Sequence, residues 1–352
     1  AAPNGAQVQA IFITADGKNT SLPFTGLSAQ EQASPEKILE AVHQAGIVGM
    51  GGAGFPAQVK FSPPPTDTID TVILNGAECE PYLTCDYRLM LEDPRTIIKG
   101  LECMLQLFPA AKGIIGIECN KPKAIESMMK ACEGMQRITV QPLQTKYPQG
   151  GEKQLIYALT KREVPSGGLP SNVGCIVSNA ATARAIGIAV AQGTPLIRRV
   201  VTLSGSAMNH CGNYDVPLGM KLSDVVELAG GFSETDPPKK LISGGPKMGN
   251  AIFDLSAPLT KACSGLGAFN AADAALPAEQ NCIRCAKCIE ACPMGLMPTT
   301  LSKLARKGDL EGFVANHGLD CIECGCCSFA CPAKRYLAQS IRAAKHSPHL
   351  KR

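Results

Sequence analysis

The sequence is poor in several kinds of residue, and each shortage excludes a class of protein. It has no tryptophan, and aromatic residues make up only 5% of the 352 residues. No run of about 18 apolar residues occurs, so we expect no transmembrane helix, and no signal-peptide pattern opens the chain. The net charge of +4 is too small to indicate a nucleic-acid-binding protein. The histidines do not form a pattern typical of nucleophilic catalysis, so we assign no catalytic residue.

Acidic residues are also absent after Glu323, although basic residues continue to the end of the chain. They are Lys334, Arg335, Arg342, Lys345, Lys351 and Arg352. A solvated basic tail is the simplest interpretation. The alternative is docking to an acidic partner or to an anionic membrane surface.

Cysteine, by contrast, is abundant, and part of it forms a doubled motif. Segments 281–295 and 320–334 each carry the spacing C-x2-C-x2-C-x3-C followed by proline. This spacing is typical of iron–sulfur ligands, and in two-cluster ferredoxins the fourth cysteine of each run ligates the other cluster. We therefore predict two 4Fe-4S clusters with crossed ligands: Cys282, Cys285, Cys288 and Cys331 for cluster one, and Cys321, Cys324, Cys327 and Cys292 for cluster two.

Two other interpretations of these cysteines are weaker. Structural zinc sites need only two pairs of ligands and usually include histidine, whereas here the third cysteine and the Cys-Pro ending repeat together. A disulfide framework is typical of small secreted domains, and this chain is not small. Cys326 lies inside the second motif but off its spacing, and we expect it to point away from the cluster. The scattered cysteines elsewhere are typical of buried core residues.

Between residues 68 and 193, strand-like segments alternate with helix-like segments. The strands are expected at 71–75, 113–118, 137–142 and 174–178, and the helices near 92–108, 122–133, 151–161 and 181–191. This alternation predicts a parallel sheet covered by helices, with ligands bound beyond the carboxyl ends of the strands. Before it, we expect a short strand at 8–13 and a helix with Ser34 as N-cap and Pro35 at its first position.

A glycine-rich segment at 46–61 contains the string G-x-G-x-x-G, at Gly49, Gly51 and Gly54. It follows a helix rather than a strand, so its context is not that of a Rossmann fingerprint. Such glycines still let backbone N–H groups approach a phosphate or a flat ring, beside which Phe55 offers a stacking face and Lys60 a charge. A glycine-rich turn without a ligand is the alternative. The acids Glu78 and Glu80, in the loop after the strand at 71–75, are either solvated or ligands.

Several motifs in the same order resemble those of the RnfC family, the NADH-side subunits of the Rnf ion-translocating ferredoxin:NAD oxidoreductases. They are GMGGAGFPAQVKF, NGAECEPYLTCDYRLM, KYPQGGEKQLIYALTKREVPSGGLP, GNYDVPLG, ISGGPKMG and the paired cysteine motifs. The resemblance covers about residues 35–345. The first half is also similar to the FMN-binding, 51-kDa-type subunit of respiratory complex I.

The resemblance implies a pocket for FMN and NAD(H). Its residues would be Gly51, Gly52, Gly54, Phe55, Lys60, Asn75, Glu78, Glu80, Gly151, Glu152, Ser178 and Asn179. Among them, Phe55 and Glu80 would help to hold NADH, and Lys60 would lie by the flavin phosphate. The chain departs from the complex I pattern at Met50, Ala77, Lys153 and Ser178.

The resemblance also implies the fold class and the domains. We expect an N-terminal segment (1–30), a Rossmann-like α/β flavin and NADH domain (31–197), an SLBB β-grasp domain (198–262), an α-helical ferredoxin-like domain with both clusters (263–345) and a basic tail (346–352). The loop Gly244–Gly249 is interpreted as a structural hinge.

The implied function is electron transfer between NADH and the two clusters through FMN, coupled in a complex to Na+ or H+ translocation. FMN accepts hydride and releases single electrons, which clusters accept one at a time. The implied partners are other membrane and cluster-bearing subunits and, indirectly, ferredoxin, at the cytoplasmic side of the membrane. Two alternatives are a related flavin and iron–sulfur cobalamin reductase, and a non-enzymatic electron conduit with an empty flavin site.

Overall fold

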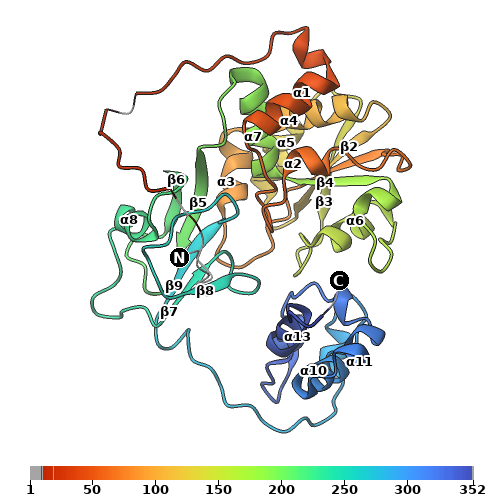
Figure 1. Ribbon diagram of the computed structural model, residues 1–352, viewed down its shortest axis with the longest axis vertical. Coiled ribbons are helices and arrows are strands. Elements are labelled where there is room, and N and C mark those ends of the chain that lie inside the picture. The colour runs from red at the N-terminus through yellow and green to blue at the C-terminus, as the bar shows by residue number, and fades with distance from the viewer. Residues whose placement is uncertain (1–8, 10, 19, 351–352) are drawn as a thin grey trace.

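The computed structural model describes residues 9, 11–18 and 20–350, which form three parts in sequence order (Figure 1). The first part contains a four-stranded parallel sheet in the order β3-β2-β1-β4. Its strands are β1 (Thr71–Asn75), β2 (Lys112–Glu118), β3 (Ile138–Leu143) and β4 (Cys175–Asn179). The helices around it are η1 (Glu31–Ala33), α1 (Pro35–Gln44), α2 (Ala57–Lys60), α3 (Cys85–Glu92), α4 (Pro94–Leu107), α5 (Pro122–Ala131), α6 (Glu152–Thr160), η2 (Pro170–Val173) and α7 (Ala180–Gln192).

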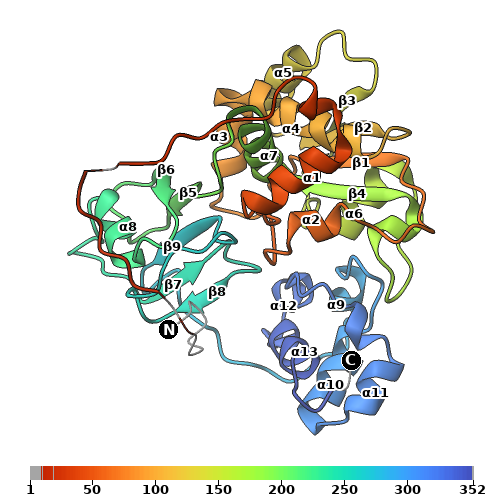
Figure 2. The same ribbon diagram turned by 45° about the horizontal axis from the view of Figure 1, so that its top comes forward.

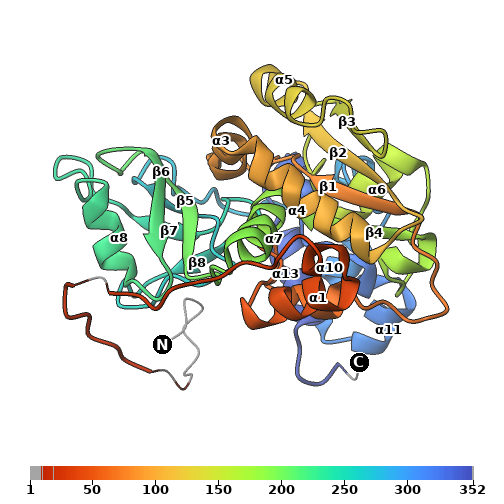
Figure 3. The same cartoon turned by 90° about the horizontal axis from the view of Figure 1, so that it is seen from above.

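Helices cover both faces of this sheet, because successive side chains of a strand point to opposite sides. Val72 and Leu74 of β1 join the larger core, with residues of α1, α4, α5 and α7. Ile73 joins a smaller core with Leu155 and Ile156 of α6. Figure 3 shows α4 and α7 side by side, and both helices belong to the larger core on one face of the sheet. All strands run parallel, so the loops after them meet at one edge.

The predicted strand–helix alternation is confirmed, and so is the start of the first helix. Pro35 is the first residue of α1, and the Ser34 side chain accepts a hydrogen bond from the N–H of Lys37. The helix predicted near 92–108, with Asp93 and Pro94 at its start, is also confirmed, because α4 has Asp93 as its N-cap and Pro94 as its first residue. The separate helix α3, which ends at Glu92, was not predicted.

The strand predicted at 8–13 is wrong for the residues of it that the structure describes. Gln9 and residues 11–13 belong to no strand, and Ile11, Phe12 and Ile13 are all at least 87% exposed. An apolar segment with no partner strand has no ladder to join, and the alternating pattern alone does not supply one. Val8 and Ala10 lie outside the described residues.

The second part is a five-stranded mixed sheet in the order β6-β5-β9-β7-β8. Its elements are β5 (Arg198–Ser204), β6 (Gly212–Pro217), α8 (Leu222–Leu228), β7 (Lys240–Ser243), β8 (Asn250–Ile252) and β9 (Gly265–Phe269). The central strand β9 pairs parallel with β5 and antiparallel with β7. The predicted end of this domain at residue 262 is therefore too early. The GLGAF sequence of β9 has no β-branched residue, and the sequence patterns did not predict it as a strand.

The third part is helical, as predicted, and residues 270–350 contain no strand. Its elements are α9 (Lys287–Glu290), α10 (Pro298–Lys307), α11 (Leu310–Ala315), η3 (Gly318–Asp320), α12 (Cys326–Ala330) and α13 (Leu337–Lys345). In Figure 2 its α9 and α12 lie toward the parallel-sheet part, and α10 and α11 lie away from it. Within the part of the chain that the structure describes, no helix is long and apolar enough to cross a membrane.

Candidate functional site

Two asparagines mark the carboxyl edge of the parallel sheet, because Asn75 ends β1 and its register partner Asn179 ends β4. The Asn75 side chain donates to the carbonyl of Gly150 at 2.8 Å and accepts from the N–H of Ala77 at 3.0 Å. Asn179 is the N-cap of α7, where its Oδ1 accepts from the N–H groups of Ala181 and Thr182. The loops after both strands are therefore fixed by side chains at the same edge.

The glycine-rich loop folds back over this edge. An antiparallel bridge between Val48 and Pro56 closes the loop, and Gly54 has a φ of +72°. A Cβ at Gly51 would lie 2.9 Å from the Cβ of Asn179, whereas a Cβ at Gly52 would meet nothing within 4 Å. Phe55 at the end of the loop is 54% exposed. The loop thus presents bare backbone above the ends of β1 and β4.

Lys60 and Glu152 form an ion pair beside this loop. Lys60 ends α2 and Glu152 begins α6, and their Nζ and Oε1 atoms lie 2.7 Å apart. Gly151 is the N-cap of α6 and lies next to Ile322 of the second cysteine motif. The structure therefore brings these three predicted residues together, at the side of the sheet that faces the third part.

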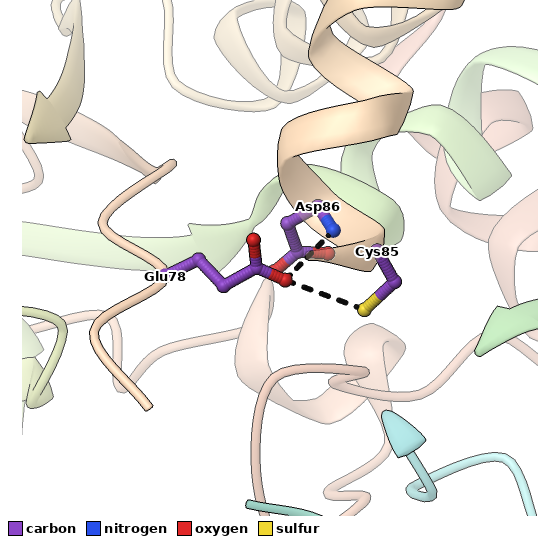
Figure 4. Close-up of side chains that lie close together, drawn as sticks. All are labelled: Glu78, Cys85 and Asp86. Atoms are coloured by element: carbon purple, nitrogen blue, oxygen red, sulfur yellow. Dashed lines mark hydrogen bonds between the residues drawn. The ribbon is translucent and has the colours of Figure 1, made fainter. Parts of the chain in front are cut away.

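Glu78 folds back onto the N-terminus of α3 (Figure 4). Its carboxylate accepts hydrogen bonds from the N–H of Asp86 at 2.9 Å and the N–H of Tyr87 at 3.2 Å. These are free donors of the first helical turn, which favour a negative charge. Burial, reinforced by the neighbouring Asp86 carboxyl, nevertheless raises the pKa of Glu78 to about 7. Burial raises the pKa of Asp86 as well.

Sequence reasoning missed two charged residues that lie against these loops. Asp86 of α3 accepts a hydrogen bond from Nδ2 of Asn179 at 2.6 Å. Arg199 of β5, 3% exposed, donates through Nη2 to the carbonyl of Met50 in the glycine-rich loop at 2.5 Å. A lone acid in a helical first turn and a lone arginine in a strand carry no motif. The only sequence signal was the position of Asp86 inside the CDYRLM part of a quoted motif.

Two buried polar atoms near the ends of β1 and β4 have no hydrogen-bond partner among the described residues. Ser178 is 5% exposed, and its hydroxyl has no hydrogen-bond partner among the described residues. The same is true of one oxygen of Asp86. Buried polar atoms of this kind are normally satisfied. Together with the bare backbone at Gly52, they fit a flavin, whose ring offers both donors and acceptors.

Glu80 differs from the other predicted pocket residues in where its carboxylate points. Its oxygens accept hydrogen bonds from the N–H of Lys247 at 3.1 Å and the N–H of Met248 at 2.9 Å, in the loop after β7. Burial raises its pKa, and these two hydrogen bonds oppose the rise. The structure thus places Glu80 at the contact between the first two parts, and its contact with NADH stays a prediction.

A cleft of about 480 Å³ lies beside Glu78 and Glu80. It is formed by the loops that follow β1, β2 and β3, and aromatic side chains line it at Tyr82, Tyr87 and Tyr147. Its Lys121 donates to the carbonyl of Glu78 at 2.9 Å. A concave site with aromatic walls and a few fixed polar groups is the usual form of a small-molecule pocket.

The two cysteine motifs have the same backbone. Arg284 and Ala286 of the first motif have φ angles of 56° and 62°, and the matching Glu323 and Gly325 of the second have φ angles of 60° and 77°. Non-glycine residues hold this left-handed conformation only where the surroundings impose it. Both segments therefore form the same kind of loop, with left-handed residues at matching positions between the cysteines.

The structure also brings cysteines of different motifs together. Cys292 of the first motif lines one cavity with Cys321, Cys324 and Cys327 of the second. These are the four residues predicted to hold cluster two. Cys326 lines the same cavity, so the expectation that it points away is wrong. The helical turn of α12, which begins at this residue, carries it there beside Cys327.

The predicted ligands of cluster one are arranged less compactly. Cys288 packs with Cys331 of the other motif in one small core, whereas Cys282 and Cys285 are exposed.

The scattered cysteines between residues 79 and 263 also differ in burial. Most are at least partly buried, as expected, but Cys119 and Cys211 are exposed.

The second cysteine motif lies directly against the loop that precedes α6. The hydroxyl of Tyr147 donates to the carbonyl of Cys324 at 2.8 Å. Burial raises the pKa of Tyr147, so the hydroxyl keeps its proton. Gln154 of α6 adds hydrogen bonds to Pro293 and Met294 of the first motif. The cavity with Cys292 is therefore the one that adjoins the parallel-sheet part.

Three family models match the chain in the order in which its parts follow one another. The Nuo51 FMN-binding domain matches residues 42–187, the SLBB domain residues 200–251, and the 4Fe-4S dicluster domain residues 276–336. These matches confirm the predicted fold class and the predicted FMN and 4Fe-4S cofactors. They do not test which individual residues hold them.

Among solved structures, the chain is similar to the NAD+-reducing [NiFe]-hydrogenase in the H2-reduced state. The TM-score is 0.60 at 21% sequence identity, over 91% of this chain and 64% of that one. At this identity the likeness concerns the fold alone.

Curated relatives are much closer in sequence. The C subunit of the proton-translocating ferredoxin:NAD(+) oxidoreductase complex of Clostridium ljungdahlii is 47% identical, over 97% of this chain and 75% of the relative. The C subunit of the Na(+)-translocating complex of Acetobacterium woodii is 41% identical, over 97% of this chain and 77% of the relative. The resemblance stated from the motifs is thereby confirmed. The chain belongs to the family of C subunits of the ion-translocating ferredoxin:NAD(+) oxidoreductases.

Proposed function

We propose that this chain is the electron-input subunit of a membrane-bound ferredoxin:NAD oxidoreductase, in which it moves electrons between NADH and two 4Fe-4S clusters. Bound FMN supplies the conversion between hydride transfer and single-electron transfer. The observation that carries the proposal is the direct contact between the parallel-sheet part and the second cysteine motif. Tyr147, from the loop that leads into α6, donates to Cys324, a predicted ligand of cluster two.

The residues of this chain have separate tasks in the proposal. The loop from Gly51 to Phe55 and the strand ends at Asn75 and Ser178 hold the flavin, with Glu78 and Asn179 as supports and Gly52 and Gly54 as points of close approach. Lys60, with Glu152 and Gly151, holds the flavin phosphate at the start of α6. The exposed Phe55 and the carboxylate of Glu80 orient NADH.

The two crossed cysteine sets hold the clusters. Cys321, Cys324, Cys327 and Cys292 hold the cluster nearer the flavin, and Cys282, Cys285, Cys288 and Cys331 hold the outer one. This order is supported by the burial of the first set near α6 and by the exposure of Cys282 and Cys285. Electrons would then leave through the exposed side of the third part. We propose the domain limits 31–197, 198–269 and 270–345.

One experiment tests the proposal. The protein is purified anaerobically, its iron and flavin are counted, and its visible absorbance is followed after NADH is added. We expect about eight irons, bound flavin, and bleaching of both cofactors. Eight irons without flavin and without a response to NADH would identify an electron conduit instead. Reduction of cob(II)alamin without electron transfer to the other subunits would identify a cobalamin reductase.

We further propose that the chain binds the membrane-embedded subunits of its complex peripherally, at the cytoplasmic side, by its C-terminal basic residues. The relatives' names, each a subunit of a complex, support this. Part of the charge is neutralised within the chain, since Arg342, Lys345 and His346 all lie within 3.3 Å of the Glu323 carboxylate. Lys334 and Arg335 make no ion pair among the described residues. Lys351 and Arg352 lie outside them. Binding to the other subunits that does not weaken with salt would refute this docking mode.

A further inference from the structure

The loop Gly244–Gly249, interpreted from sequence as a hinge, is a junction of all three parts of the molecule. It follows β7, and its backbone N–H groups at Lys247 and Met248 hold both oxygens of Glu80. The contact leaves no room for a side chain, because a Cβ at Gly245 would lie 2.2 Å from Oε2 of Glu80. The loop is thus fitted to the loop that follows β1.

The side chain of Lys247 extends from this loop to two aromatic rings. Its Nζ lies 4.0 Å from the centroid of the Tyr147 ring and 4.7 Å from the centroid of the Phe329 ring. Tyr147 belongs to the parallel-sheet part, and Phe329 belongs to α12, between the cysteines at 327 and 331. An ammonium group at these distances is attracted to the face of each ring.

The same junction includes the backbone of the second cysteine motif. Tyr147 donates its hydroxyl proton to the carbonyl of Cys324 at 2.8 Å. A Cβ built at Gly325 would lie 3.8 Å from the carbonyl oxygen of Lys247, so the two loops lie side by side. Lys247 therefore contacts the parallel-sheet part with its backbone N–H and its ammonium group, and the third part with its ammonium group.

The covalent connection does little to fix these parts. Between the end of β9 at Phe269 and the start of α9 at Lys287, the chain forms no helix or strand. The distance between the flavin pocket and the second cysteine motif thus depends on non-covalent contacts. Phe329 is 80% exposed and contributes little to the packing of its own helix, so its position under Lys247 is not explained by a core role.

We propose that Lys247 is a positioning residue for electron transfer. It clamps the loop of cluster two against the flavin part, and so sets the distance across which electrons pass between them. The inference rests on the proposed function. It adds the residue that fixes the position of the cluster loop relative to the flavin part. The lysine touches neither flavin nor substrate in this role.

The test compares three variants of the anaerobically purified holoprotein. Lys247→Met removes the charge but keeps most of the length of the side chain and the backbone bonds to Glu80. Lys247→Arg keeps a cation over both rings. Lys239→Met removes an exposed lysine of the same part and serves as the control.

The first measurement is hydrogen exchange without NADH, which reads the contact independently of activity. In Lys247→Met we expect the peptides at 244–250 and 326–335 to exchange roughly tenfold faster, as for a contact of this kind lost from a junction. The second is the rate of cluster reduction after NADH is added, followed by freeze-quench EPR. We expect it to fall roughly tenfold while flavin bleaching by NADH is unchanged, and Lys247→Arg to restore both readouts.

Two results would overturn the clamp: exchange and cluster reduction in Lys247→Met equal to those of Lys239→Met, or an equal slowing of flavin bleaching and cluster reduction. Failure of the proposed function looks different, because the unmodified protein with full flavin and iron would then not respond to NADH. Hydrogen exchange would still decide whether Lys247 holds the two loops together. In a double-mutant cycle, the effects of Lys247→Met and Phe329→Leu should not add, because the Lys247 ammonium group contacts the Phe329 ring.

Discussion

Gly51 lies so close to Asn179 that a Cβ at position 51 would be 2.9 Å from the Cβ of that asparagine. The neighbouring Gly52 has open space where its Cβ would be. The two glycines therefore stand in different relations to the protein. Gly51 is required by the packing of the loop on the sheet edge, whereas the space beside Gly52 is open, as expected if a ligand binds there.

The first prediction separates these two roles by stability. Gly51→Ala should lower the free energy of unfolding by about 1–3 kcal/mol, the usual cost of overpacking, because Asn179 is held by its capping bonds and cannot move away freely. Gly52→Ala should leave stability unchanged. Chemical unfolding followed by circular dichroism measures both. Equal stabilities for the two variants would contradict the described packing.

The second prediction concerns the flavin phosphate. Lys60→Met should weaken FMN binding by roughly ten- to a hundredfold, because it removes a charge-assisted contact. Stability should change little, since the Lys60–Glu152 pair is partly exposed. Flavin fluorescence during reconstitution of the flavin-free protein measures the affinity. Lys37→Met is the matched control, because Lys37 also pairs with an acid, Glu40, but far from the pocket in sequence.

The third prediction tests the crossed ligand sets. Cys292→Ser should destroy the cluster held by Cys321, Cys324 and Cys327 and spare the one beside Cys292 in sequence. EPR of the dithionite-reduced protein, with an iron count, distinguishes the two clusters. Cys326→Ser is the control, because this residue lines the same cavity but is not a predicted ligand. Survival of this cluster in Cys292→Ser together with its loss in Cys326→Ser would show that Cys326 is the fourth ligand instead.

The fourth prediction concerns pH. Burial and Asp86 raise the pKa of Glu78 from 4.5 to about 7, so the folded chain binds its proton more tightly than the unfolded chain. Stability is therefore greatest below the unfolded value and falls as the pH rises through about 7. Glu78→Gln should remove this fall, with a relative gain of at most about 3 kcal/mol between about pH 5 and about pH 8.

The measurement is chemical unfolding of wild type and Glu78→Gln at both pH values. Asp86→Asn is a useful companion, because it removes the neighbouring carboxyl while Glu78 keeps its bonds to the helix start. It should flatten the pH dependence only in part, since burial is the larger cause of the raised pKa. An identical pH dependence in all three proteins would contradict the assignment.

Local signals in the sequence predicted much of the fold. Ser34 and Pro35 mark a helix start because capping acts within a few residues, and the apolar segment 71–75 is read correctly as a buried parallel strand. The strand at Gly265–Phe269 was missed, because it has two glycines and no β-branched residue, and its pairing with β5 and β7 makes it a strand.

The candidate site was predictable only as far as its motifs extend. The cysteine spacing alone predicts the crossed ligand sets, and the structure places Cys292 in one cavity with Cys321, Cys324 and Cys327. The contact between Glu80 and Lys247 joins residues 167 positions apart, and no periodicity or spacing carries such a pair. Asp86 and Arg199 were missed for the same reason, since their importance comes from what the fold brings beside them.

The small core around Cys288, Cys327, Cys331, Ala333 and Leu337 consists largely of residues predicted to bind metal. We therefore expect folding of this small core to be coupled to metal assembly. The apolar core of Leu301, Phe313, Ile341, Ala344 and Leu350 in the same part contains no predicted ligand. Damage by oxygen would then remove a structural element as well as a redox centre. Loss of the clusters is expected to loosen this small core, whereas the larger core of the parallel-sheet part contains no predicted cluster ligand and should stay folded.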